Sequence, residues 1–238
     1  MMRILGIIPA RYASSRFPGK PLAKILSKSM IQRVYEQCKK CVLLSDIIIA
    51  TDDKRIYDHV ISFGGRTIMT KKSHVSGTDR CGEVLDNLSC RYDIVVNIQG
   101  DEPYINPKQI SELIWELQDN NAQISTLAKE IKEVSVIKDE NSPKVKFDKK
   151  QNAISFYRKP KYISHQETYF KHIGIYAFKT NVLKNIINLP ASENEKKEKL
   201  EQLRWTDNGF KIKVGITKYD TISVDTPNDI LKIESQIR

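Results

Sequence analysis

The sequence predicts an α/β fold built around a mostly parallel sheet. In the first half of the chain, short β-branched runs alternate with longer amphipathic stretches, which is the pattern of parallel strands joined by crossover helices. The run at residues 93–98 is mostly apolar, as expected of a strand buried on both faces. The length of 238 residues fits one large domain or a domain with a small lobe.

Apolar runs and capping residues set the expected elements of the first half. Asp52 and Asp53 are both placed to cap the second helix, and the glycines at residues 64–65 end it by allowing a positive φ. Residues 76–79 (Ser-Gly-Thr-Asp) resemble a capped helix start, and Pro107 suits a first helical position. We therefore expect strands at residues 4–8, 47–50, 67–69, 93–98 and 124–128, and helices over about 29–43, 53–63, 76–88 and 107–120.

The second half is less regular. Its β-branched runs predict strands, the first two of which are consistent with a hairpin. Amphipathic stretches between and after these runs predict three helices. The expected strands lie at residues 145–147, 153–157, 173–178 and 211–218, and the expected helices at about 181–187, 195–207 and 228–237.

The net charge of +10 favours an anionic partner. Nucleic acid, a membrane surface and a small polyanion such as a nucleoside triphosphate all satisfy this charge. Much of the excess is lysine spread over predicted helix faces, for example Lys196 and Lys197, as on an ordinary solvated surface. A helix-turn-helix, zinc-finger or RNP-type signature is missing from the sequence, so we expect no nucleic-acid partner.

Apolar runs in this chain are too short for a membrane. Residues 47–50 and 94–96 are among the longest, far below the ~20 residues that span a bilayer. The N-terminal apolar stretch has neither the length of a signal-peptide core nor a small-residue cleavage site. These patterns predict a cytoplasmic protein with no membrane partner.

The cysteines have three possible interpretations: a zinc site, a redox site or free thiols. Cys38 and Cys41 form a CxxC pair, which occurs in zinc and redox sites. Cys81 and Cys90 lack the close spacing of a second zinc-binding pair, and the CxxC closes a predicted helix instead of opening one. We therefore expect free thiols at or under the end of a helix.

Polar residues gather where the predicted strands end, and open α/β sheets bind ligands at that edge. Residues 9–21 (PARYASSRFPGKP), named the basic loop, follow the first strand and carry Arg11, Arg16 and Lys20. Backbone N–H groups and these cations can hold phosphate oxygens. The basic loop matches neither the dinucleotide fingerprint nor the P-loop, so its pattern alone leaves the ligand open.

Three further segments lie at the ends of other strands or the starts of helices. Asp101 follows Gly100 at the end of a central strand, where a hard cation bridging phosphates needs oxygen ligands. Asp225 precedes a Thr-Pro turn, and residues 76–80 read Ser-Gly-Thr-Asp-Arg. Helix capping explains all three segments as well as ligand binding does, although a helix N-terminus also favours anions.

Eight stretches in order carry a family resemblance: IIPARYASSRFPGKPL, IIIATDD, HVSGTDR, VVNIQGDEP, FYRKP, KHIGIYAF, LEQLRW and VDTPND. With them the chain resembles the 3-deoxy-manno-octulosonate (Kdo) cytidylyltransferases, also called CMP-Kdo synthetases. The resemblance implies a nucleotide-diphospho-sugar transferase fold, Rossmann-like, with a smaller sugar-binding and dimerisation lobe. It implies one domain over residues 1–238, with a nucleotide-binding part at about 1–130, a sugar-binding and dimerisation part at about 131–222, and a metal turn and helix at 223–238.

The resemblance also implies a role for individual residues. The nucleotide would be bound by Pro9, Ala10, Arg11, Arg16, Lys20, Ser76, Gly77, Arg80 and Gln99. The sugar would be bound by Gln99, Arg158, His172, Tyr176, Glu201 and Gln202, with Arg158 facing its carboxylate. Asp101 and Asp225 would ligate magnesium, and with Lys20 and Arg11 they would form the catalytic set. Without the resemblance, His172 would suit a structural histidine, and Glu201 and Gln202 an exposed helix surface.

The implied reaction is attack of the anomeric 2-hydroxyl of Kdo on the α-phosphate of CTP, with magnesium as cofactor and pyrophosphate as the second product. A homodimer is implied, as is a place in lipopolysaccharide or capsule synthesis. Departures from the family pattern lie at residues 27–30 (SKSM), at Tyr157, where a serine is common, and in the linker at residues 159–170, which is poorer in Pro and Trp. Tyr157 lies beside the implied sugar pocket, so a related acidic sugar, such as 8-amino-Kdo or a sialic-like acid, stays open as the alternative substrate.

Overall fold

The computed structural model describes residues 2–14, 16–118, 122–160, 162–164, 166–220 and 222–237, with side chains described as far as Ser235. The chain forms two compact units. The first comprises Met1–Ser111 and Thr221–Arg238, and the second comprises Glu112–Asp220. Helix α4 (Pro107–Glu116) contains the division between them. The domain boundaries expected from the sequence stay a prediction.

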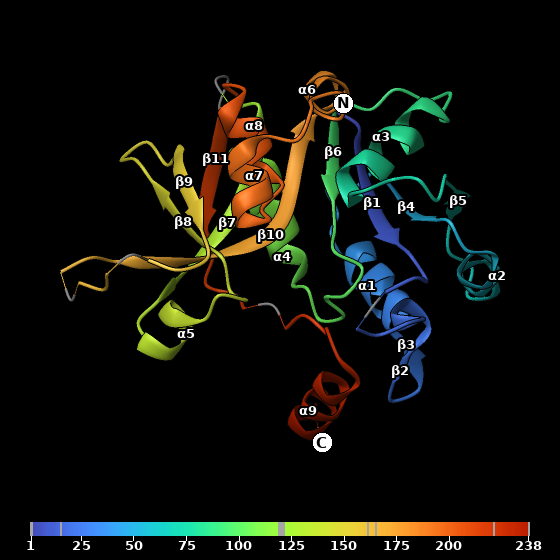
Figure 1. The fold of residues 1–238 in the computed structure, drawn as a ribbon. Coiled ribbons are helices and arrows are strands. Elements are labelled where there is room, and N and C mark those ends of the chain that lie inside the picture. The colour runs from blue at the N-terminus through green and yellow to red at the C-terminus, as the bar shows by residue number, and fades with distance from the viewer. Residues whose placement is uncertain are drawn as a thin grey trace. The chain divides into compact units, whose positions relative to one another are not determined.

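The first unit contains four parallel strands in the order β6-β1-β4-β5 (Figure 1). Strand β1 lies between two partners, because Ile7 pairs with Ile48 on one side and with Asn97 on the other. Strands β1, β4 and β6 are buried almost throughout, which explains their continuous apolar runs, whereas β5 at the edge is half-exposed. Their bounds are Ile4–Ala10 (β1), Asp46–Thr51 (β4), Thr67–Met69 (β5) and Ile94–Asn97 (β6).

Helices of the first unit begin at the capping residues that the sequence indicates. Ser29, Asp53 and Ser76 each accept a backbone N–H from the first turn, and Ser76 completes a capping box with Asp79. Gly64 adopts a φ of 75° after the second helix, as predicted. The helices are α1 (Met30–Lys39), α2 (Lys54–Ser62), α3 (Gly77–Asp86) and α9 (Pro227–Ile237), with a short 3₁₀ helix at Lys20–Leu22 and a two-strand ribbon of β2 (Lys24–Ile25) and β3 (Lys28–Ser29).

The second unit has a mixed sheet. Strand β7 (Ile124–Ile131) pairs in parallel with β11 (Ile212–Ile216) and antiparallel with β10 (Tyr169–Lys179). The expected hairpin is confirmed, because β8 (Lys144–Phe147) and β9 (Ala153–Tyr157) pair antiparallel. The helices are α5 (Val134–Lys138), α6 (Thr180–Ile186), α7 (Glu193–Glu198) and α8 (Gln202–Asp207).

Several elements differ from the sequence-based expectation: β10 begins at Tyr169 instead of residue 173, and α5 and the ribbon of β2 and β3 were not expected. The first helix ends at Lys39, four residues before the expected end. The single helix expected at residues 195–207 is instead two helices, α7 and α8. They are separated at Lys199, which adopts a left-handed conformation with φ 54° and ψ 47°. A lysine in this region is strained, and neither a glycine nor a proline marks the break in the sequence.

An apolar cluster anchors α9 within the first unit. Ile233 of α9 and Val224, which precedes it, are buried with Ile25 and Met30. The Leu26 backbone N–H also donates to Glu234 Oε1 over 2.7 Å. This packing fixes the residues between Val224 and α9, which include Asp225.

The described part of the chain contains free thiols, three of them buried: Cys38, Cys41 and Cys81. Burial raises the pKa of the Cys38 thiol, so it stays protonated at neutral pH. Among the described helices, none has the length and apolar character needed to cross a bilayer.

Candidate active site

All residues predicted for the nucleotide and the metal line one cavity of about 290 Å³ in the first unit. The cavity lies where β1 and β6 end and where α3 begins, as the strand-end rule predicts. The residues in question are Pro9, Ala10, Arg11, Arg16, Lys20, Ser76, Gly77, Arg80, Gln99, Asp101 and Asp225. Their direct contact with a nucleotide or metal stays a prediction.

Tyr12 shapes the basic loop. Its carbonyl accepts the Gly19 backbone N–H over 2.9 Å, which closes the loop on itself. Gly19 has a φ of 71°, and a Cβ there would meet the Tyr12 ring at 3.1 Å. The Arg55 guanidinium stacks on the same ring at 3.3 Å from its centroid. The loop conformation is therefore held without any ligand.

Gly100 brings the end of β6 against the end of β1. A Cβ at Gly100 would lie 2.8 Å from the Pro9 carbonyl oxygen, closer than van der Waals contact allows. A larger residue would push the two strand ends apart. The close approach places Gln99 and Asp101 on the same cavity wall as the basic loop.

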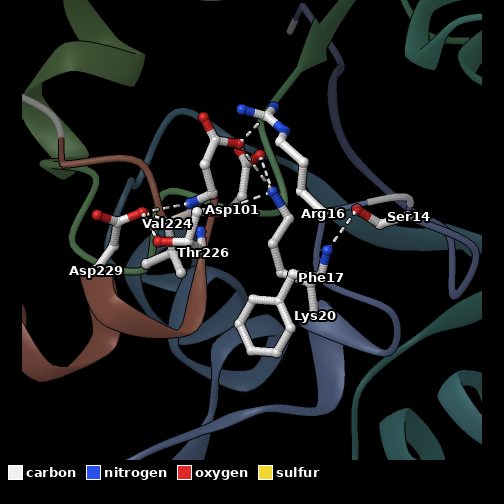
Figure 2. A network of polar contacts seen from close by, with 9 residues as sticks. Ser14, Arg16, Phe17, Lys20, Asp101, Val224, Thr226 and Asp229 are labelled. Carbon is white, nitrogen blue, oxygen red and sulfur yellow. Dashed lines mark hydrogen bonds and ion pairs between the residues drawn. The ribbon is translucent and has the colours of Figure 1, made fainter.

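Lys20 lies between the two predicted metal ligands (Figure 2). Its Nζ donates to Asp101 Oδ2 over 2.7 Å and to the Val224 carbonyl over 2.8 Å, and it lies 3.5 Å from Asp225 Oδ1. Arg16 Nη2 also donates to Asp225 Oδ1, over 3.0 Å. Two cations of the basic loop thus neutralise two carboxylates that are more than a hundred residues apart in sequence.

These carboxylates suit a magnesium ion. Asp101 and Asp225 direct oxygens at one ammonium group, so the position already selects a cation. Magnesium at nucleotide sites is commonly held by one or two carboxylates together with phosphate oxygens and water. Within the described ranges, no group of three or more His, Cys, Asp or Glu side chains forms a complete protein cage. The donor set therefore fits a cation shared with a phosphorylated substrate.

Ser76 and Arg80 contribute to the cavity through α3. Ser76 caps the helix, whose N-terminus lines the cavity and attracts anions. Arg80 is only 3% exposed and donates to Asp52 Oδ2 over 2.9 Å and to Thr70 Oγ1. Its guanidinium therefore ties α3 to the end of β4 and to the residue that follows β5.

The sugar residues predicted on β10 lie in a buried aromatic cluster of the second unit. His172 Nε2 lies 2.9 Å from Thr126 Oγ1, whose hydroxyl also reaches the Ile173 and Ile175 carbonyls. Because the hydroxyl has carbonyl acceptors, this arrangement favours Nε2–H as the donor to Thr126. Burial lowers the pKa of His172 to about 3, so the ring is neutral.

Tyr176 extends this cluster, and Gln202 is buried in the same unit. The Tyr176 ring lies 5.5 Å from His172 and 4.9 Å from Trp205. Burial and the nearby Glu201 carboxylate raise the pKa of Tyr176, so its hydroxyl stays protonated and can donate. Gln202 is 3% exposed, and its Nε2 has no hydrogen-bond partner among the described residues. An unpartnered buried amide is costly, so Gln202 is suited to meet a substrate oxygen.

Arg158 makes contacts that the sequence did not predict. Its guanidinium donates to three backbone carbonyls: Glu198 over 2.7 Å, Glu140 over 2.9 Å and Lys199 over 3.0 Å. Two of these lie at the left-handed break between α7 and α8, just before Glu201. Arg158 thus supports the turn that leads into the predicted sugar residues, and its contact with a sugar carboxylate stays a prediction.

Sequence reasoning missed two residues near the cavity. His74 lines it and contacts Glu83 Oε2 through Nε2, and Asp52 holds Arg80. Each had one hint in the sequence, its position beside a predicted feature. His74 lies two residues before Ser76, and Asp52 directly follows strand β4. Both have partners distant in sequence, which a local pattern does not reveal.

Comparison with known proteins gives one family over most of the chain. The family described as cytidylyltransferase matches residues 5–212. A 3-deoxy-manno-octulosonate cytidylyltransferase of Parabacteroides distasonis is 49% identical, covering 98% of this chain and 97% of its own. A protein of the same name from Bacteroides thetaiotaomicron is 47% identical, covering 100% and 99%.

Solved structures give a matching picture. A CMP:2-keto-3-deoxy-manno-octonic acid synthetase complexed with CTP superposes with a TM-score of 0.93 at 38% identity, covering 99% of this chain and 98% of that one. A putative glucose-1-phosphate thymidylyltransferase of Bacillus anthracis has a TM-score of 0.69 at 18% identity, covering 99% and 95%, and shows the same fold alone. The expected nucleotidyltransferase fold is therefore confirmed.

Proposed function

This chain belongs to the cytidylyltransferase family, and we infer that it transfers CMP from CTP to 3-deoxy-manno-octulosonate, giving CMP-Kdo and pyrophosphate. The observation that carries the inference is the cavity of the first unit. It gathers Arg11, Arg16, Lys20, Asp101 and Asp225 in a chain that is nearly half identical to enzymes of that name. A triphosphate needs cations, and a metal that accompanies it needs carboxylates.

Phosphoryl transfer of this type depends on positioning and charge neutralisation more than on covalent catalysis. The 2-hydroxyl oxygen of the sugar forms a bond to the α-phosphorus, and the bond from that phosphorus to the bridging oxygen of pyrophosphate breaks. The hydroxyl proton leaves to solvent or to a phosphate oxygen. The three cations of the basic loop are placed to neutralise the charge that grows on the leaving pyrophosphate.

We propose that Asp101 and Asp225 hold magnesium, since their carboxylates converge on the Lys20 ammonium group. When bound, magnesium supplies Lewis acidity that favours the deprotonated hydroxyl and neutralises phosphate charge. Lys20 and Arg16 then have phosphate oxygens as alternative partners, which frees both carboxylates. The ion pairs of the basic loop with the carboxylates would thereby be exchanged without leaving an uncompensated charge.

We propose that the sugar binds through His172, Tyr176, Glu201 and Gln202 of the second unit. Neutral His172 and the protonated Tyr176 hydroxyl contribute polarity without net charge, and Gln202 contributes its unpartnered amide. Hydroxyl recognition requires such neutral donors and acceptors. The homodimer, the cytoplasmic location and the supply of lipopolysaccharide or capsule synthesis rest on the family resemblance and stay predictions.

Pyrophosphate release tests the proposal. We expect release from CTP with Kdo in the presence of magnesium, and much slower release from ATP, GTP or UTP. A panel containing Kdo, 8-amino-Kdo and a sialic acid ranks the sugars, and excess chelator should stop turnover. Full turnover in chelator would remove magnesium from the proposal, and no release with any acidic sugar would refute the function.

A further inference from the structure

We propose that Asp229 is a positioning residue that sets the Asp225 carboxylate for the metal. This proposal rests on the proposed function of the cavity, because it concerns one of the two carboxylates assigned to magnesium. Asp229 lies in the first turn of α9 and does not line the cavity. Its role is therefore indirect and follows from the hydrogen bonds that it makes (Figure 2).

A single carboxylate oxygen of Asp229 accepts hydrogen bonds from the turn that contains Asp225. Asp229 Oδ2 accepts the Asp225 backbone N–H over 3.1 Å, the Thr226 backbone N–H over 2.9 Å and the Thr226 hydroxyl over 2.9 Å. The Asp229 backbone N–H donates back to the Thr226 carbonyl over 3.1 Å. The bond from the Thr226 N–H is one half of an ordinary capping box, whereas the bond from the Asp225 N–H also holds the residue before the helix cap.

The other flank of Asp225 is held by the cavity itself. The Val224 backbone N–H donates to the Asp101 carbonyl over 2.9 Å, and the Val224 carbonyl accepts from Lys20 Nζ over 2.8 Å. Asp225 is thus fixed between a residue tied to Asp101 and a residue tied to Asp229. The Val224 N–H bond is made by backbone atoms alone, so Asp229 is the side chain through which the other anchor can be removed.

Loss of Asp229 leaves the two N–H groups of the turn without their acceptor, and the turn can then rotate. The Asp225 carboxylate would no longer be held toward Asp101, so a divalent cation would lose one of its two protein carboxylates. Among the described residues, Arg11 makes no hydrogen bond to this turn, and the pairs of Arg16 and Lys20 with Asp225 are the ones that phosphate oxygens replace. Nucleotide binding without metal should therefore change little.

Three variants test this role. Asp229→Ala removes the acceptor, and Asp229→Asn keeps an acceptor oxygen without its charge. Glu234→Gln is the matched control, because it weakens the bond from the Leu26 N–H that helps to hold α9 while leaving the turn intact. The probe is Mn²⁺, titrated by water-proton relaxation with CTP at saturation and no sugar, after subtraction of the curve without protein. CTP binding in chelator and the metal-free Tm are measured for every variant.

We expect Asp229→Ala to weaken Mn²⁺ binding by about tenfold or more, as the loss of residues that orient metal ligands commonly does. Asp229→Asn should weaken it about threefold, because a charge-assisted bond becomes a neutral one. Glu234→Gln should match the wild type, and the Kd for CTP in chelator should stay within about twofold throughout.

A lower Tm for Asp229→Ala with Mn²⁺ binding equal to that of the control would make Asp229 a helix cap only and overturn the proposal. If Asp229→Ala does not fold, wild-type Mn²⁺ affinity in Asp229→Asn overturns it instead. Absence of CTP-dependent Mn²⁺ binding by the wild type would refute the metal site of the proposed function, and this proposal with it. If the wild type binds Mn²⁺ and both Asp229 variants bind it equally well, the metal site stands and the role of Asp229 is refuted.

Discussion

Lys20 Nζ donates a 2.7 Å hydrogen bond to Asp101 Oδ2, and both side chains are largely withdrawn from solvent, at 16% and 29% exposed. The ammonium group thereby occupies the position that a metal would share between Asp101 and Asp225. Two carboxylates facing one another across a cavity would repel without such a cation. Lys20 therefore neutralises the two carboxylates, and a bound nucleotide would offer it phosphate oxygens as alternative partners.

Replacing Lys20 with glutamine should reveal both roles. We expect the metal-free free energy of unfolding to fall by about 1–2 kcal/mol, because Asp101 and Val224 lose their donor. Magnesium with CTP should restore more stability to the variant than to the wild type, and kcat should fall about a hundredfold. Chemical denaturation in chelator and in Mg·CTP, with steady-state kinetics, measures these effects.

Lys28→Gln is the control for this comparison, since Lys28 forms an exposed pair with Glu36 and does not line the cavity. Exposed pairs contribute little, so its stability should stay within about 0.5 kcal/mol of the wild type. Equal metal-free stability of the two variants would show that Lys20 does not neutralise the carboxylates.

Asp101→Asn and Asp225→Asn should each lower kcat by about a hundredfold or more, since metal stabilisation is worth several kcal/mol. Asparagine removes the charge but keeps the size and any capping ability. The double variant should lose less than the product of the two single losses, because both residues act on one ion. Initial rates at saturating magnesium measure all three, and near-normal kcat in a single variant excludes that residue as a ligand.

Asp148→Asn is the same substitution at a carboxylate that accepts backbone N–H groups in a turn and does not line the cavity, so it serves as the control. Its kcat should equal that of the wild type. The metal-free Tm of Asp101→Asn and Asp225→Asn should fall slightly, since each loses an ion pair with the basic loop. Without the pairing with Lys20 and Arg16, relief of carboxylate repulsion would instead leave the Tm unchanged or raise it.

Elements governed by local pattern could be predicted from the sequence. Apolar runs identified the buried parallel strands, and Ser76 and Gly64 marked helix ends through bonds and conformations that involve neighbouring residues. The break at Lys199 could not be predicted in this way. It depends on Arg158, which is about 40 residues away in sequence and binds the carbonyls on both sides of the break. A lysine in a left-handed conformation is stable only when such distant contacts hold it.

The same distinction applies to the candidate site. The strand-end rule and the clustered charges were enough to predict that Arg11, Lys20 and Asp101 share a site, because parallel strands end at one edge. They could not show that Lys20 bonds to Val224, because the two are 204 positions apart. The hydrogen bond from Arg80 to Asp52 could not be predicted for the same reason. Ion-pair partners depend on tertiary packing, which residue type and spacing do not encode.

Arg158 can be tested with two substitutions of different shape. Arg158→Ala and Arg158→Lys should both raise the KM for the sugar, by an amount equivalent to about 1.5–3 kcal/mol for alanine. The KM for CTP should stay within about twofold. Lysine keeps the charge but lacks the planar fork that holds three carbonyls, so it should also lower the Tm.

Lys159→Ala is the control for Arg158, since Lys159 is its neighbour and forms an exposed pair with Glu140. Steady-state kinetics in both substrates and thermal unfolding distinguish the outcomes. Full sugar affinity and normal Tm in Arg158→Lys would show that charge alone matters. A rise in the CTP KM with no change for the sugar would place Arg158 outside the sugar site.

His172 should make the protein less stable in acid. Burial holds the pKa of the folded state at about 3, below the value near 6.5 of an unfolded histidine. Between these two pH values the unfolded chain binds the proton and the folded chain does not, so acid favours unfolding. Above about pH 6.5 the histidine is neutral in both states and has no effect on pH dependence.

We therefore expect the stability difference between wild type and His172→Gln to depend on pH. At pH 7 the variant should be less stable by about 2 kcal/mol, because it loses the bond to Thr126 and the ring contacts with Phe156 and Tyr176. Below pH 6 the difference should shrink by about 1.4 kcal/mol per pH unit, since the variant has no proton to gain at this position. Urea unfolding at pH 7, 6, 5 and 4.5 measures the difference, and a constant value over that range would show that His172 titrates normally. The pH profile of kcat should keep its neutral-range shape in the variant, because a ring that stays neutral above pH 5 does not act as the general base.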